Sequence, residues 1–531
     1  MKATKLTIIL AAAALILGSC DKFLDVNPDK RAEVDTKGEM SSLLGSAYPT
    51  HVMISMAEMM SDNIDDFGLT SFNNTKRFLD QVYKFEEITE SDNESPENCW
   101  WDHWRAIAAT NVTLEALAGL GTPDDPDLRE IYGEAYIARA YNHFMLGTMF
   151  CMPYDPVHSN TDPGLPYLTA VENGFNIQHD RGTVAQLYAA IEADIERALP
   201  LVGDSRYRVP KYHFNQNAAY AFATRFFLFY GKYERAIECA NRVLGESPAT
   251  VLKDWAYLGG LPTGTNGPLI HATGYCDSSS PANLLLQACY STHGYVWANY
   301  STYNRFSHGS YLSSTEDMEA TYPWGKSTFR DGVKTYSGSM DKIIFWRVPR
   351  IFQYTDPVAG TGYVRTICLS LSTDETLLNR AEANILLGNY QEACDDLNLW
   401  LHNITTSTFV LTPANIKSFY NGVAYHGWSK ATVKKHLHPG FDIGEEGGDK
   451  ETMLQCLLNC KRLELIGFGH RWQDLRRYGI TVHRRQMNIT DAGYVPVSVT
   501  DSLEARDPRF ALQIPYKVIQ GGFTPNPRKN Q

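Results

Sequence analysis

The chain has 531 residues and carries 48 Lys and Arg against 60 Asp and Glu, a formal net charge of −12. Its 44% hydrophobic and 20% charged residues and its mean hydropathy of −0.30 exclude a wholly disordered chain and a polytopic membrane protein. The acidic balance argues against nucleic acid as a partner, because such proteins need a clustered basic surface. Tyr (30) and Trp (10) are numerous, and both can pack apolar surface while still hydrogen bonding.

The N-terminus reads as an export signal. Lys2 and Lys5 precede the apolar run Leu6–Leu17, which is too short to span a bilayer as a helix. The run ends in Leu-Gly-Ser-Cys20, which resembles a bacterial lipobox. We therefore predict that residues 1–19 are a lipoprotein signal peptide and that lipidated Cys20 anchors the protein to a membrane. An ordinary cleavage site with a coincidental cysteine is the alternative.

The other nine cysteines do not suggest a disulfide framework. Their number is odd, they are scattered along the chain, and no Cys-x-x-Cys motif occurs. Cys456 and Cys460 have helical i, i+4 spacing, which could hold a metal ion. Small buried core residues are the simpler interpretation, so we predict no metal site.

Two segments predict helix–turn–helix units. Residues 218–244 and 376–401 each contain an apolar helix followed by Gly-x-Tyr-x-x-Ala, at Gly231 and at Gly388. Glycine permits the positive φ that ends the first helix, and the pattern resembles a tetratricopeptide repeat. Residues 133–150 and 183–201 also have helical spacing, with Thr183 as an N-cap. A generic helical bundle is the alternative.

A different region separates the two units. Residues 251–372 are rich in Gly and Ser, poor in helical periodicity, and contain 15 of the Tyr and Trp residues. Strand-like pieces occur at 284–290 and 342–348. We therefore divide the mature chain into an N-terminal helical part (20–250), a candidate ligand-binding insertion (251–372) and a C-terminal helical part (373–531).

Several short motifs, taken in order, resemble the SusD/RagB lipoproteins. They are the Cys20–Pro28 tether, the acidic loop Ser61–Asp66, Trp104–Ile107 with Asn111, Gly164–Thr169, Leu378 with Ala381–Ala383, and Arg462–Gly479. Each is weak alone, but together they cover the chain from Cys20 to about Arg528. The resemblance implies a mostly α fold, a tetratricopeptide-like repeat scaffold with a long, irregular, aromatic-rich insertion carrying short strands.

The resemblance also implies a function. Such a protein would face outward on the outer membrane, capture an oligosaccharide and pass it to a SusC-like TonB-dependent transporter. A RagB-like protein that binds peptide or another nutrient is the alternative, and a glycoside hydrolase is a weaker one.

Ligand-contacting residues are predicted from side-chain chemistry, because the family has no fixed contact motif. Aromatic rings cover the C–H face of a sugar, while Asn and Arg hydrogen bond its hydroxyl groups. The residues predicted to contact ligand are Tyr295, Trp297, Asn299, Tyr300, Arg305 and Trp324 in the insertion, with Asn73 and Arg77 in the early loop. Trp324 follows Tyr-Pro in a turn-like setting, which favours exposure.

The sequence contains no Gly-x-Ser-x-Gly, P-loop, Gly-x-Gly-x-x-Gly or His-Glu-x-x-His motif. The adjacent acids Asp65/Asp66 and Asp374/Glu375 would not face each other on a strand or a helix, so they do not suggest a glycosidase pair. Glu464 and Arg471–Arg477 are predicted to form a structural ion network. We predict no catalytic residues and no cofactor. A structural calcium ion in an oxygen-rich loop is left open, although no EF-hand spacing is present.

Overall fold

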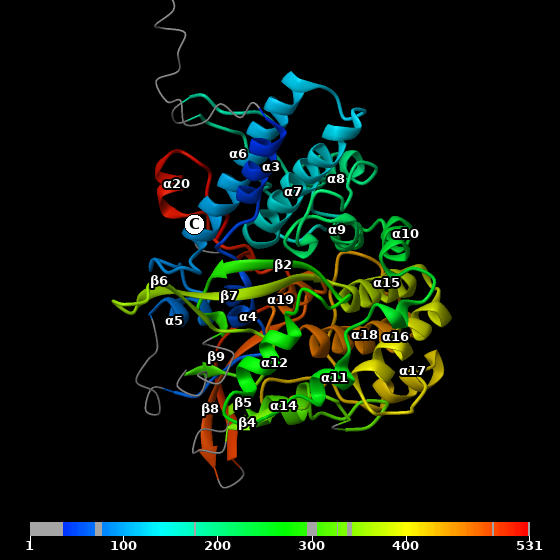
Figure 1. The fold of residues 1–531 in the computed structure, drawn as a ribbon. Coiled ribbons are helices and arrows are strands. Elements are labelled where there is room, and N and C mark those ends of the chain that lie inside the picture. The colour runs from blue at the N-terminus through cyan, green and yellow to red at the C-terminus, as the bar shows by residue number, and fades with distance from the viewer. Residues whose placement is uncertain are drawn as a thin grey trace, which may run out of the picture.

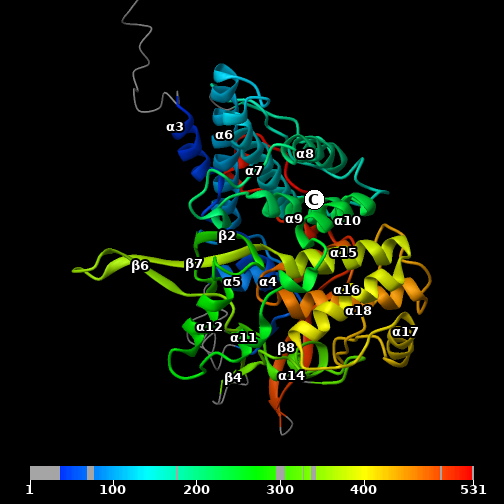
Figure 2. The same ribbon diagram turned by 45° about the vertical axis from the view of Figure 1, so that its right-hand side comes forward.

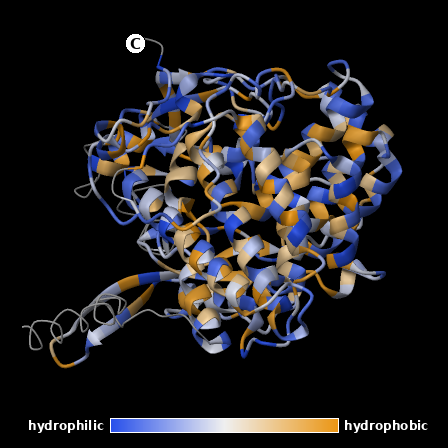
Figure 3. Ribbon diagram, turned by 90° about the horizontal axis from the view of Figure 1, so that it is seen from above, coloured by the Kyte–Doolittle hydropathy of each residue, from blue (hydrophilic) through white to orange (hydrophobic). Residues whose placement is uncertain are grey.

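The structure, a computed structural model, describes residues 36–68, 77–174, 177–294, 305–326, 328–336, 342–490 and 493–528. These residues form a mainly α-helical body with three small sheets (Figure 1). Hydrophobic and hydrophilic residues are interspersed along the helices of the body (Figure 3). Among the described residues, no helix combines the length and hydrophobicity needed to cross a membrane.

The N-terminal part is mainly helical, and several of its helices begin at a side-chain cap. They are α3 (Lys37–Leu43), α4 (Ile54–Met60), α5 (Arg77–Tyr83), α6 (Pro96–Leu120), α7 (Pro126–Phe150) and α8 (Val184–Ala198). The side chains of Ser95 and Asp125 accept hydrogen bonds at the starts of α6 and α7. Thr183 forms a capping box with Gln186, which confirms the predicted N-cap of α8.

Both predicted helix–turn–helix units are present. The first is α9 (Gln216–Phe229) with α10 (Tyr233–Leu244), and the second is α15 (Thr373–Leu387) with α16 (Tyr390–Ile404). The turns contain Gly231 and Gly388, with φ values of 79° and 87°. Although an insertion separates the units in sequence, α10 packs directly against α15 (Figure 1). The tetratricopeptide-like prediction is therefore confirmed.

Gly388→Ala is expected to lower the free energy of unfolding by about 1–2 kcal/mol, because a side chain disfavours this left-handed conformation. A Cβ atom there meets no atom within 4 Å, so the loss reflects backbone conformation alone. Gly422→Ala, also unobstructed but without positive φ, is the control and is expected to cause no loss. Equal urea-unfolding midpoints for both variants would contradict the claim that the turn requires the left-handed conformation at Gly388.

The insertion contains more regular structure than its composition suggests. Its elements are α11 (Trp255–Gly259), α12 (Gly267–Tyr275), β2 (Asn283–Tyr290), β3 (Phe306–Ser307), α14 (Ser310–Glu316), β4 (Lys334–Tyr336), β5 (Lys342–Ile344), β6 (Ile351–Asp356) and β7 (Thr361–Ser372). The strand predicted at 284–290 is confirmed, whereas the strand predicted at 342–348 ends at Ile344. Strands β2, β7 and β6 form an antiparallel sheet, and β6 and β7 project from the body as an arm (Figure 2).

The C-terminal part closes the body. It contains α17 (Pro413–Gly422), α18 (Asp449–Leu465), α19 (His470–Arg477), β8 (Val482–Thr490), β9 (Gly493–Leu503) and α20 (Tyr516–Gln520). The hairpin β8–β9 joins β1 (Asp65–Asp66) and β3 in a sheet of order β3-β1-β8-β9. This sheet joins the early acidic loop, the insertion and the C-terminus.

Candidate ligand-binding site

Two of the predicted polar residues lie near α5. Arg77 is the first residue of this helix, and Arg305 directly precedes β3. The Arg305 guanidinium donates from Nε to Asp66 Oδ1 at 2.5 Å, and its Nη1 lies 3.3 Å from Asp80 Oδ1 on α5. Arg305 therefore joins the insertion to the residues on both sides of the early loop.

The pairing of β1 with β3 brings together the residues that flank two predicted contact segments. The Phe67 amide donates to the Arg305 carbonyl at 3.0 Å, so the chain leaving β1 and the chain entering β3 are adjacent. Tyr295, Trp297, Asn299 and Tyr300 lie outside the described residues, as do Asn73 and Cys20.

Arg305 is largely buried and held by acidic side chains. Its side chain is only 12% exposed, and it lies in ion pairs with Asp66 and Asp80. The predicted ligand contact of Arg305 stays a prediction, and the structure adds that two carboxylates hold its guanidinium in place. Arg77 is exposed, as a ligand contact requires, and forms an ion pair with Glu90 at 3.1 Å.

Trp324 is not the exposed platform that its sequence setting suggested. The predicted turn exists, with reciprocal backbone hydrogen bonds between Tyr322 and Gly325. The indole is nevertheless only 6% exposed, because it stacks on Tyr322 at 4.7 Å and meets the edge of Trp400 on α16. The prediction of an exposed Trp324 was wrong because the turn faces a helix from a distant part of the chain.

A groove of about 620 Å³ lies beside α5, a size typical of small-molecule sites. One wall is formed within residues 85–97 and the other within residues 509–528. Two ion pairs cross it, Lys517 with Glu97 and Arg528 with Glu87, each at 2.6 Å. Glu90, the partner of Arg77, also lines the groove. Sequence reasoning missed this groove because its walls are about 420 residues apart.

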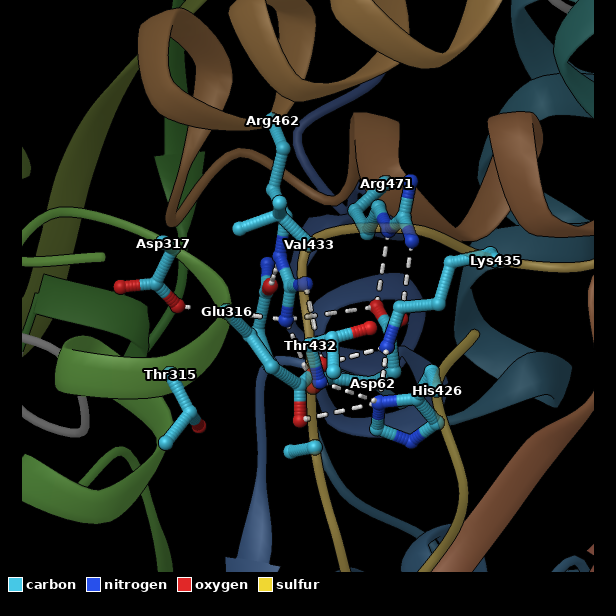
Figure 4. Close-up of polar contacts among 12 residues, drawn as sticks. Asp62, Thr315, Glu316, Asp317, His426, Thr432, Val433, Lys435, Arg462 and Arg471 are labelled. Carbon is cyan, nitrogen blue, oxygen red and sulfur yellow. Dashed lines mark hydrogen bonds and ion pairs between the residues drawn. The ribbon is translucent and has the colours of Figure 1, made fainter. Parts of the chain in front are cut away.

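Behind β1 lies a buried cluster that we call the central ion network, formed by Asp62, Glu316, Lys435, Arg462, Arg471 and Arg485. Glu316 accepts from Lys435 Nζ at 2.6 Å, Arg485 Nη1 at 2.7 Å and Arg462 Nη1 at 3.2 Å. Figure 4 shows Arg462, Arg471 and Lys435 converging on the acids. The network fixes β1 and α14 relative to the C-terminal helices, and so supports the edge where Arg305 lies.

Burial and the neighbouring charges determine the protonation states of the residues in this network. Burial opposes ionisation of Glu316, but the surrounding cations hold its pKa well below its usual range. Burial lowers the pKa of Lys435 to about 8, and lowers that of the adjacent His426 to about 3. At neutral pH His426 is therefore uncharged, and the charges are carried by the acids, the arginines and Lys435.

The predicted ion network around α19 is confirmed in part. Arg471 Nε donates to Asp62 at 2.8 Å, and Arg477 pairs with Glu382 at 2.9 Å. Glu464 differs: its Oε2 accepts from Trp400 Nε1 at 3.0 Å, and no ion pair to Glu464 occurs among the described residues. The buried positions of Cys456 and Cys460 confirm that they are core residues.

The acid pairs considered for catalysis bind different protein partners. Asp65 pairs with Arg485 and Asp66 with Arg305. Glu375 pairs with Arg225, while Asp374 accepts the Lys253 amide. These carboxylates form structural contacts, and within the described residues no three His, Cys, Asp or Glu side chains are grouped to hold a metal ion.

Comparisons with known proteins agree with this architecture. A family model described as "Starch-binding associating with outer membrane" matches residues 22–228, and one described as "SusD family" matches residues 373–507. No curated protein matches the chain.

Solved structures share the fold. A putative sugar binding protein from Bacteroides vulgatus is 16% identical with a TM-score of 0.66, over 94% of this chain and 99% of that one. A SusD superfamily protein from Bacteroides thetaiotaomicron is 18% identical with a TM-score of 0.61, over 92% and 98%. Another, from Bacteroides vulgatus, is 18% identical with a TM-score of 0.62, over 92% and 97%. At these identities the likeness is one of fold.

Proposed function

The chain belongs to the SusD/RagB family. We propose that it binds an oligosaccharide beside α5, at the edge where β1 pairs with β3, and delivers it to a SusC-like TonB-dependent transporter. The protein captures its ligand without cleaving it. Lipidated Cys20 anchors it to the outer membrane, with the ligand-binding face toward the outside.

The pairing of β1 with β3 is the observation that supports this site. It brings together one described end of each of two segments, residues 69–76 and 295–304. The first segment contains Phe and Asn, and the second combines Trp and Tyr with Asn. Arg305, Asp66 and Asp80 lock those ends together, and the network behind them keeps the edge rigid. A preorganised edge of this kind reduces the entropy lost on binding.

Trp297→Ala is expected to weaken saccharide binding by about 30-fold, because truncating an aromatic anchor costs about 2 kcal/mol. Native affinity gels containing starch, xylan, pectin or mannan, followed by calorimetry with the matching oligosaccharide, measure the effect. Tyr257→Ala, which removes another exposed aromatic of the insertion, is the control and is expected to bind as the wild type does.

Three other results would overturn parts of the proposal. Equal affinities of wild type and Trp297→Ala would remove Trp297 from the site. Binding of peptides without any saccharide would favour the RagB-like alternative. Release of reducing sugar by the pure protein would favour the alternative that it is a glycoside hydrolase.

A further inference from the structure

The arm formed by β6 and β7 has two chemically different faces. In this antiparallel pair Gln353 is opposite Tyr363, and Ile351 is opposite Arg365, which is in turn opposite Tyr290 on β2. Opposed residues and residues two apart share a face. We call the set Tyr290, Gln353, Tyr363 and Arg365 the Tyr363 face. Phe352 and Tyr354 lie on the other face.

Aromatic rings follow one another along the Tyr363 face. The ring centroids of Tyr363 and Tyr290 are 5.5 Å apart, and those of Tyr290 and His51 are 5.8 Å apart. The Tyr290 amide donates to the Thr50 carbonyl at 2.8 Å, which holds the His51 segment against the end of β2. Tyr363 is 55% exposed, so much of its ring is uncovered.

Hydrogen-bonding groups accompany these rings. Arg365 lies over the Tyr290 ring, 3.9 Å from its centroid, and donates from Nη2 to the Tyr290 hydroxyl at 2.6 Å. Its Nε–H is buried and has no acceptor among the described residues, so any ligand contact of Arg365 would be made by the rest of its guanidinium. Gln353 is exposed beside Tyr363. At the far end His51 contacts Asp102, which also pairs with the exposed Arg105.

This combination matches the surface of a sugar chain. An exposed tyrosine ring covers the C–H face of a pyranose, and guanidinium, amide and imidazole groups meet its hydroxyl rim. The face also lies close in sequence to predicted contact residues, because Tyr290 ends β2 and the Tyr295–Arg305 stretch follows a few residues later. The opposite face carries Phe352 and Tyr354, whose rings pack edge to face on each other at 4.9 Å.

We propose that the Tyr363 face is a second saccharide-contact surface. It holds one end of a long saccharide whose other end occupies the proposed site beside α5. Tyr363 is the stacking ring, and Tyr290 orients Arg365 toward the hydroxyl groups. The inference rests on the proposed function and adds to it: the natural ligand is a long saccharide engaged at two places. Two linked contacts raise the affinity for a long chain without changing that for a short one.

The test compares Tyr363→Ala with Tyr354→Ala in the full-length mature protein. Tyr354 is the matched control, since it is 58% exposed, has the same side chain and lies on the same arm but on the other face. One probe is the polysaccharide that retards the wild type most strongly in native affinity gels. The other is a trisaccharide made of the same sugar units. Calorimetry measures the affinity for each. We expect Tyr363→Ala to weaken polysaccharide binding by about two- to tenfold and to leave trisaccharide affinity unchanged.

The outcomes separate this inference from the proposed function. If the wild type binds polysaccharide but Tyr363→Ala binds it equally well, the second surface is overturned while the function stands. If Tyr354→Ala loses as much as Tyr363→Ala, the face assignment is wrong. If the wild type binds neither probe, the proposed function itself fails. Arg365→Gln, which keeps a planar amide but loses the cationic fork, is expected to reproduce part of the Tyr363→Ala loss.

Discussion

Replacing Glu316 with Gln is expected to lower the free energy of unfolding by about 3–5 kcal/mol, because it removes the carboxylate shared by three buried cations and leaves buried positive charge in excess. Glu316 is fully buried and contacts Lys435, Arg462 and Arg485. The substitution keeps the size of the side chain, so the loss measures charge rather than packing. Urea unfolding monitored by tryptophan fluorescence provides the measurement.

Asp442→Asn is the control for this prediction. Asp442 forms an ion pair with Lys450 at 2.8 Å, but its side chain is 79% exposed. Solvent screens such pairs, so little change in the unfolding midpoint is expected. If Glu316→Gln were as stable as Asp442→Asn, the cations of the central ion network would have to be compensated in another way.

Glu464→Gln is expected to make the protein more stable than the wild type by a margin that grows as pH rises from about 5 to 8. Burial, with the Asp374 carboxylate adding to it, raises the pKa of Glu464 from 4.5 to about 8. Between these values the folded wild type keeps a proton that the unfolded chain releases. Wild-type stability therefore falls with pH by up to about 1.4 kcal/mol per unit, a slope that glutamine removes.

The measurement is the unfolding free energy of both proteins at pH 5, 6, 7 and 8. Glutamine preserves an acceptor for Trp400 Nε1, so the variant should fold. Glu392→Gln, an exposed acid on α16, is the control and should follow the wild-type curve. Parallel curves for Glu464→Gln and the wild type would show that Glu464 is ionised in the folded protein.

Local patterns were sufficient to predict the helical repeats. The Gly-x-Tyr-x-x-Ala pattern, combined with apolar periodicity, determines a helix end and the start of the next helix within about ten residues, and both units formed around Gly231 and Gly388. Thr183 is a similar case, because a cap depends on atoms three residues away. The strands of the arm were missed, since exposed Tyr and Thr between glycines resemble a loop as much as a hairpin.

Side-chain exposure was harder to predict than secondary structure. The turn at Trp324 was recognisable from Pro and Gly, but the helix that covers it begins at Tyr390. Arg305 had suitable chemistry for a sugar contact, yet its partners Asp66 and Asp80 are more than 220 residues away. Pairing between distant charges leaves no periodic signal, so the partners of Arg471 in the central ion network and the groove beside α5 could be found only in three dimensions.

The central ion network has a consequence for how the molecule is made. Arg471 is 409 residues away from Asp62, and the two join only when nearly the whole polypeptide is present. A chain synthesised from its N-terminus therefore exposes Asp62 and the residues around β1 long before their cationic partners exist. The segment around β1 can therefore gain these ion pairs only after the C-terminal helices have formed, so the edge made by β1 and β3 is completed late in folding.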